Sequence, residues 1–76
     1  MNPSVLAKRI KNLRIDLDLS QDAVAEMAQL SSRAVISRYE NEKVIPDLVS
    51  LIKVANVLNT TVAYLIGETD NARKKK

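Results

Sequence analysis

Apolar side chains recur every three to four residues along most of this 76-residue chain, the spacing that places them on one face of an α-helix. The first segment shows one such stripe, formed by Leu6, Ile10, Leu13 and Leu17. Polar residues interrupt the pattern between segments, and no segment alternates as a strand would. The pattern predicts an all-α domain with helices over about residues 4–17, 20–28, 33–40, 47–58 and 61–66.

Residues that favour helix ends mark the same boundaries. Side chains that cap helix N-termini precede four of the segments, namely Asn2, Ser20, Asp47 and Thr61. Either Ser31 or Ser32 can cap the third segment, and Gly67 suits the left-handed residue that ends the fifth. Beyond that helix the chain is polar and charged. We therefore expect one folded domain over residues 1–68 and a basic, disordered tail over residues 69–76.

Composition excludes several kinds of chemistry. The chain contains no cysteine and no histidine, so it can form neither a disulfide nor the usual zinc site. It lacks a glycine-rich phosphate loop, and its serines have no base partner to activate them. No apolar run approaches the roughly 18 residues that span a bilayer, and charges stand where a signal peptide needs its apolar centre. We expect a soluble, intracellular protein that is not an enzyme, spans no membrane and binds no metal, cofactor or small-molecule ligand.

The net charge of +3 is misleading as evidence for a nucleic-acid partner, because four of the twelve basic residues stand at positions 73–76. Without them the chain carries eight basic and nine acidic residues, a net charge of −1. An argument for DNA must therefore rest on where the charges lie, since a nearly neutral domain can still present one basic face. The basic end itself is compatible with a solvated tail, a nonspecific phosphate contact or an artificial addition.

The segment from Leu19 to Asn41 is the most informative part of the chain. Its pattern predicts two short amphipathic helices joined by a tight polar turn, a geometry that can place a helix end in the DNA major groove. The second of these helices turns Val35, Ile36 and Tyr39 inward, which leaves hydrogen-bonding and cationic side chains exposed. This arrangement predicts a sequence-specific DNA-binding protein.

The exposed side of that second helix carries the candidates for base contact. They are Ser32, Arg33, Ala34, Ser37 and Arg38. Arginine can bond to O6 and N7 of guanine together, and a small apolar side chain can contact a thymine methyl group, so Arg33 is the main candidate. Arg38 lies nearer the helix C-terminus and could contact a base or a phosphate. The alternative is that both arginines only solvate an exposed face.

Groups of residues at characteristic spacings extend over about Leu6 to Gly67. They are Arg9-Ile10 with Leu13-Arg14, Leu19-Ser20-Gln21 with Val24-Ala25, Ile36 to Asn41 with Lys43 and Pro46, and Leu51 to Ala55 with Leu58, Thr61, Tyr64-Leu65 and Gly67. Together they resemble the Cro/CI-type helix-turn-helix domains (XRE family) of phage repressors and related bacterial regulators. The resemblance implies a compact five-helix, lambda-repressor-like fold with the helix-turn-helix in its second and third helices.

Three features depart from the pattern of that family. The turn between the second and third helices lacks the usual glycine, and the spacing from Ser20-Gln21 to Tyr39-Glu40 is one residue longer than is common. The extra residue lies within residues 29–33, so the start of the recognition helix is predicted only to within one position. Glu42 stands where glycine is common.

The resemblance also implies contacts with the DNA backbone. Gln21 stands at the N-terminus of the second helix, where it can donate to a phosphate oxygen and brace a side chain of the third helix. Asn41 and Lys43 would reach the other strand from the loop after the third helix, and such contacts position a protein without selecting a sequence. Lys11 and Arg9 are weaker candidates of the same kind on the first helix, where each could be a plain surface charge.

An ion pair and a dimer surface follow from the same resemblance. Arg14 and Glu40 are expected to pair and to hold the recognition helix at its angle, unless the pair is an exposed salt bridge of little consequence. Family members bind near-palindromic sites as twofold dimers, with half-sites about 34–36 Å apart. The residues of the implied homodimer surface, which also suit the core or its rim, are Val57, Asn59, Thr60, Tyr64 and Leu65.

The resulting hypothesis is a transcriptional regulator, most simply a phage or bacterial repressor that occupies a double-stranded DNA operator as a homodimer. It would be cytoplasmic and associated with the bacterial nucleoid. The alternatives are an antitoxin-type regulator, the DNA-binding part of a longer repressor, and a protein-interaction module on the same scaffold. An interaction module should carry apolar residues on the third helix, where this chain has Arg33, Ser37 and Arg38. That difference favours DNA.

Overall fold

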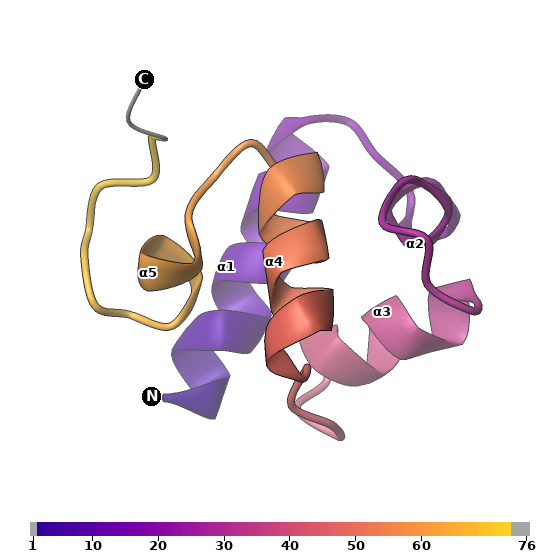
Figure 1. Cartoon of the computed structure of the whole chain (residues 1–76), viewed down its shortest axis with the longest axis horizontal. Helices are drawn as coiled ribbons and strands as arrows, with labels where there is room; N and C mark the ends of the chain where they lie inside the picture. The colour runs from indigo at the N-terminus through magenta and orange to yellow at the C-terminus, as the bar shows by residue number, and fades with distance from the viewer. Residues whose placement is uncertain (1, 74–76) are drawn as a thin grey trace.

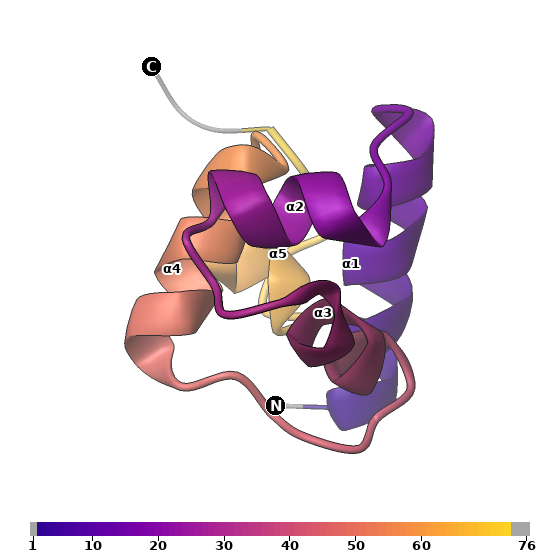
Figure 2. The same ribbon diagram turned by 90° about the vertical axis from the view of Figure 1, so that its right-hand side faces the viewer.

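The computed structural model describes residues 2–73 and contains the five helices that the sequence predicts, with no strand in that part of the chain. Their bounds are Pro3–Asp16 for α1, Gln21–Met27 for α2, Arg33–Glu40 for α3, Leu48–Val57 for α4 and Val62–Leu65 for α5. Figure 1 shows α4 in front of α1, and Figure 2 shows these two helices on opposite sides of the molecule, with α2 and α3 in front and α5 behind. The all-α class is confirmed.

Side chains cap four of these helices at the residues that the sequence predicts: Asn2, Ser20, Asp47 and Thr61. At α4 the Asp47 carboxylate accepts the backbone N–H of Ser50 at 2.7 Å, and this hydrogen bond lowers the pKa of the carboxyl group. Ser32 occupies the N-cap position of α3, but its side chain makes no capping hydrogen bond. α3 therefore begins differently from the other four helices.

Each of the five helices ends with a residue in the left-handed backbone conformation. After α2, Gln29 has a φ of 57°, its N–H bonds to the Glu26 carbonyl at 3.0 Å, and the Leu30 N–H returns to the Ala25 carbonyl at 2.8 Å. This pair of bonds is the Schellman motif. The left-handed residues after the other helices are Asp18, Glu42, Asn59 and Gly67. Gln29 and Glu42 thus adopt the backbone conformation that glycine favours, which explains how the chain forms these turns without it.

The apolar faces of the helices meet in one core. The largest fully buried apolar side chains are Ile10, Val24, Ile36, Val54, Leu58 and Leu65. Every helix contributes at least one of them, and burial of a side chain of this size contributes about 1.5–3 kcal/mol. Because Ile36 is among them, the core fixes the position of α3 against its neighbours and leaves the opposite face of that helix to solvent.

Residues 69–73, here called the C-terminal strap, lie against the folded body, although the sequence predicts a disordered tail there. The Thr60 hydroxyl donates to the Ala72 carbonyl at 2.6 Å and ties the strap to the end of α4. Residues 74–76, which carry the rest of the predicted basic tail, lie outside the described residues. The predicted tail is therefore attached to the body as far as residue 73.

Candidate nucleic-acid interface

α3 carries the residues predicted for base contact on its outer side. Four of them are exposed and one, Ser37, is half-buried; the exposed ones are Ser32, Arg33, Ala34 and Arg38. On the other side of the helix Ile36 and Tyr39 are buried, and Val35 packs against the core. α3 is therefore anchored by its apolar face and presents a polar, cationic one.

The turn that joins α2 to α3 comprises residues 28–32. α3 begins at Arg33, with Ser32 as its N-cap residue. Figure 2 shows α2 lying across the view while α3 points toward the viewer, so the two helices cross steeply. This is the arrangement that presents the start of a second helix to a DNA groove.

Arg14, Gln21 and Glu40 form one hydrogen-bonded cluster behind α3. The Arg14 guanidinium donates from Nε to Glu40 Oε2 at 2.7 Å and from Nη2 to Glu40 Oε1 at 3.0 Å. Gln21 Nε2 donates to Glu40 Oε1 at 3.2 Å, and Arg14 Nη1 donates to the Leu19 carbonyl at 2.9 Å. The predicted ion pair is thus present and bidentate, and Gln21 braces a side chain of α3 as expected. The cluster connects the last residue of α3 to α1 and to the start of α2.

Three residues predicted for phosphate contact lie at the surface. Lys11 and Lys43 are exposed on α1 and on the loop after α3. Asn41 is also exposed, but its carboxamide folds back on α3 and donates to the carbonyl and to the hydroxyl of Ser37. The fourth, Gln21, is half-buried and uses one hydrogen of its Nε2 group in the bond to Glu40.

Arg9, also predicted to contact phosphate, has partners within the monomer. Its guanidinium donates to the carbonyls of Tyr64 at 2.6 Å and of Thr69 at 2.7 Å, and to the Asp70 carboxylate at 3.0 Å. It also stacks on the Tyr64 ring, 4.0 Å from the ring centroid, as in a cation–π contact. Arg9 therefore holds the C-terminal strap and α5 against α1, and three of its five N–H donors are used in these contacts.

Two of the residues predicted for the dimer surface are buried within the monomer. The side chain of Leu65 is 0% exposed in the core, and Thr60 is 1% exposed, with its hydroxyl bonded to the strap. Neither can meet a second molecule while the monomer keeps this fold, so both predictions are wrong. Val57 and Tyr64 are half-buried, and only Asn59 of the five predicted residues is fully at the surface.

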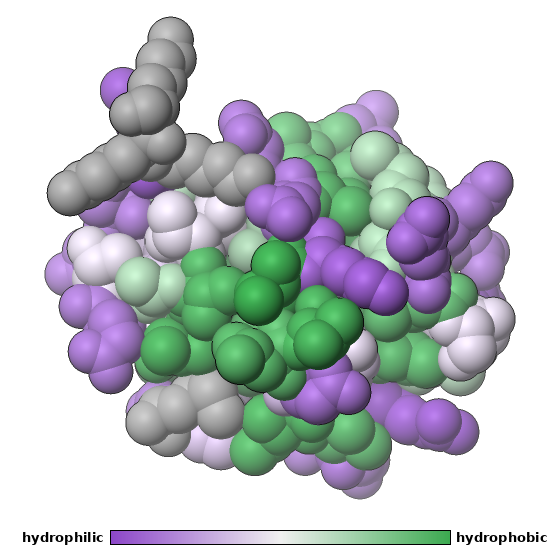
Figure 3. Space-filling view, in the orientation of Figure 1, coloured by the Kyte–Doolittle hydropathy of each residue, from purple (hydrophilic) through white to green (hydrophobic). Residues whose placement is uncertain are grey.

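An exposed apolar surface that sequence reasoning missed lies over α4 and the loop before it. It consists of Val44, Ile45, Leu48, Val49 and Ile52, here called the apolar patch. Figure 3 shows apolar residues gathered on this face of the molecule. Leu48 and Ile52 follow the helical spacing of a core residue, yet Leu48 is 67% exposed. The sequence signal was limited to the width of the apolar arc on α4, which exceeds what one core covers but does not tell which residues are exposed.

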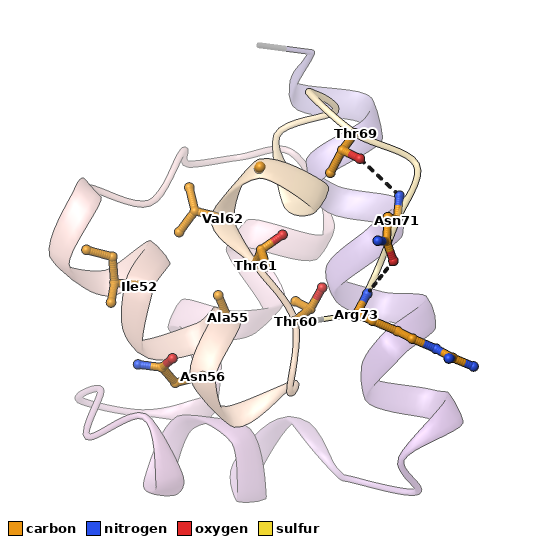
Figure 4. Close-up of a pocket in the computed structure, with 10 residues that line it drawn as sticks. Ile52, Ala55, Asn56, Thr60, Thr61, Val62, Thr69, Asn71 and Arg73 are labelled. Carbon is orange, nitrogen blue, oxygen red and sulfur yellow. Dashed lines mark hydrogen bonds between the residues drawn. The ribbon is translucent and has the colours of Figure 1, made fainter. Parts of the chain in front are cut away.

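The strap, α4 and α5 enclose an open pocket of about 560 Å³ at the opposite end of the molecule from α3 (Figures 1 and 4). Part of its polar lining serves the strap. The Asn71 N–H donates to the Thr69 hydroxyl at 3.2 Å, and the Arg73 N–H donates to Asn71 Oδ1 at 3.1 Å. Residues 2–73 contain no group of acidic side chains suited to a metal ion and no helix long and apolar enough to cross a bilayer.

The steep crossing of α2 and α3 and the anchored, cationic outer face of α3 define a helix-turn-helix domain. A sequence model of the helix-turn-helix family matches residues 10–65. The HTH-type transcriptional regulator ImmR of Bacillus subtilis (strain 168) is 30% identical over 71 residues, which cover 93% of this chain and 55% of that protein. No solved structure is significantly similar to the chain.

The chain belongs to the XRE family of helix-turn-helix proteins, a family of DNA-binding transcriptional regulators. It spans about half the length of the curated relative that it matches.

Proposed function

We propose that this domain binds double-stranded DNA in a sequence-dependent manner by inserting α3 into the major groove. The observation that carries the proposal is the position of Arg33 and Arg38 on the exposed side of a helix that Glu40 ties to Arg14. A guanidinium on a fixed helix can select guanine by two hydrogen bonds. Lys43, Lys11 and Gln21 supply donors for the phosphate backbone on either side of α3.

The biological role that fits best is that of a transcriptional repressor, which excludes other proteins from a near-palindromic operator by occupying it. Two copies are needed for such a site. The Cα atoms of one molecule extend 28 × 24 × 22 Å, whereas half-sites lie about 34–36 Å apart. Each molecule therefore covers one half-site, and a homodimer covers the operator.

The surface best suited to join the two copies is the apolar patch. It is uncharged, so it is complementary to itself under a twofold axis, which brings the same surface of each molecule together. It begins in the loop that directly follows α3, so a dimer formed through it would keep both recognition helices close to the contact. Stable interfaces engage about 20–30 residues on each side. Because the patch is smaller, we expect a weak dimer that assembles on DNA.

The decisive experiment is the selection of bound sites from random duplex DNA, carried out with the wild type and with Arg33→Ala. We expect a twofold-symmetric motif that loses its preference at one base position per half-site in the variant, since a bidentate arginine contributes about 1–3 kcal/mol of discrimination. Arg73→Ala, an exposed arginine on the strap, is the matched control and should leave the motif unchanged. Binding by the wild type without any sequence preference at physiological salt would refute the proposal.

A further inference from the structure

Asn41 and Ser37 are bonded to each other at the C-terminal end of α3. Asn41 Nδ2 donates to the Ser37 carbonyl at 2.8 Å and to the Ser37 hydroxyl oxygen at 3.2 Å. A carboxamide nitrogen carries two hydrogens, so these bonds use both. The backbone N–H of Asn41 also bonds to the Ser37 carbonyl, at 3.0 Å. All donors of Asn41 are thus engaged on α3. Because a phosphate oxygen can only accept a hydrogen bond, a contact with it would need a free donor.

The same bonds restrict what the Ser37 hydroxyl can do. A serine hydroxyl donates one hydrogen and accepts through its oxygen. Asn41 occupies the oxygen as a donor, which directs the hydroxyl hydrogen of Ser37 away from Nδ2. This occupies one of the two acceptor positions of the oxygen and leaves its hydrogen free, so donation is the favoured mode in which Ser37 meets a partner in the groove. Purine N7, guanine O6 and thymine O4 accept such a hydrogen bond, whereas adenine N6 and cytosine N4 are donors themselves.

The other residues of the loop after α3 indicate which group contacts the DNA backbone on this side. The backbone N–H groups of Glu42 and Lys43 return to the carbonyls of Tyr39 at 3.3 Å and Arg38 at 2.9 Å, so the loop backbone is occupied as well. The Lys43 side chain is exposed and cationic, and an ammonium group needs no neighbour to orient it toward a phosphate. We therefore assign the contact with the DNA phosphate backbone on this side of α3 to Lys43.

We propose that Asn41 is a positioning residue for base selection: it fixes Ser37 as a hydrogen-bond donor toward the major groove and does not contact phosphate. This inference rests on the proposed function, because it requires α3 to lie in the groove. At the base that faces Ser37, the domain then prefers a base that offers an acceptor in the major groove over cytosine, whose only polar group there is a donor. Without Asn41 both acceptor positions of the hydroxyl are open and its hydrogen is no longer directed, so the preference weakens.

The test compares Asn41→Ala, Ser37→Ala, the double variant and Lys43→Ala with the wild type. Dissociation constants are measured at several salt concentrations on the selected operator and on duplexes changed at one symmetric base position at a time. Circular dichroism checks the fold, which should survive because Asn41 and Lys43 are exposed and Ser37 is only half-buried.

We expect Asn41→Ala to lower discrimination at one base position per half-site by about two- to tenfold, the effect of one hydrogen bond. The salt dependence should stay as in the wild type. In the Ser37→Ala background the effect of Asn41→Ala should vanish, because Asn41 acts through that hydroxyl. Lys43→Ala should instead weaken binding equally on all duplexes and lower the salt slope by about one.

A uniform loss of affinity in Asn41→Ala with a lower salt slope would identify a phosphate contact and overturn the inference. So would an effect that adds to that of Ser37→Ala, or no effect. Each of these outcomes leaves a wild type that binds its operator selectively, so the proposed function would stand. If the wild type binds without sequence preference, both the proposed function and this inference are refuted.

Discussion

The Glu40 carboxylate is a buried charge whose stability depends on its partners. Its side chain is 3% exposed, and it accepts two hydrogen bonds from Arg14 and one from Gln21. A carboxylate taken out of water is tolerated only when such bonds replace its hydration. The hydrogen bond to Glu40 in turn raises the pKa of the Arg14 guanidinium, which keeps Arg14 charged.

Removal of one partner should therefore cost more than the pair itself contributes. We expect Arg14→Ala to lower the free energy of unfolding by about 3–5 kcal/mol, because it leaves the Glu40 charge buried without its main donor. Urea denaturation followed by circular dichroism measures the loss.

The double variant Arg14→Met, Glu40→Leu is the control, since it removes both charges and keeps apolar volume. It should regain most of the stability. A loss below about 1 kcal/mol in Arg14→Ala would mean that water replaces Arg14 at Glu40 and that the pair behaves as a surface salt bridge.

At the scale of single residues, the sequence predicts those roles that depend on neighbours along a helix. The exposed side of α3 follows from its own spacing, and Arg14 and Glu40 follow from the family pattern. Arg9 is different, because its partner Asp70 is 61 residues away. Helical spacing alone gives no information about such a contact. The bond of Thr60 to Ala72 lies equally outside what a local pattern can predict.

At the scale of elements, the turn after α2 stores backbone strain that glycine would relieve. Gln29 holds a left-handed conformation in which the Cβ of an L-residue costs roughly 1–2 kcal/mol. Glycine at that position loses about 0.5–1 kcal/mol through its greater freedom in the unfolded chain. We therefore expect Gln29→Gly to raise the free energy of unfolding by about 0.5–1 kcal/mol, measured in urea.

Glu26→Gly provides the contrast, since Glu26 is also exposed but lies within α2. Glycine there should lower stability by about 1 kcal/mol. If both variants are equally destabilised, the left-handed turn is not strained.

Helix positions were predictable because capping residues and apolar spacing agree at each boundary. The exposure of apolar side chains on α4 was not predictable. Its ten residues include apolar side chains over an arc too wide for one core, and the spacing alone cannot tell which of them face outward. Packing against the other helices buries Leu51 and leaves Leu48 and Ile52 in solvent. A one-dimensional pattern therefore identified the helix and missed the apolar patch.

At the scale of the whole molecule, the apolar patch should govern cooperative occupation of an operator. Val49 is 62% exposed, so Val49→Glu should fold normally but place a charge at the twofold contact. We expect the wild type to bind a duplex with two half-sites more tightly than two independent sites would allow, and the variant to lose that advantage. Titrations on duplexes with one and with two half-sites measure it.

Ile15→Glu is the matched control, because Ile15 is an exposed aliphatic residue of α1 outside the patch. It introduces the same charge and should keep the cooperativity. If Val49→Glu binds the two half-sites as cooperatively as Ile15→Glu, the copies meet through another surface.

The missing side-chain cap at Ser32 makes the two ends of α3 unequal. The far end is locked by Glu40 and by the Schellman turn at Glu42, so fraying of the helix begins at its first turn. Arg33 and Ala34 can adjust there by small backbone rotations while Arg38 keeps its place. Arg33 should accordingly reach its base by adjustment of the first turn on binding, whereas Arg38 meets the DNA in a position that is already set.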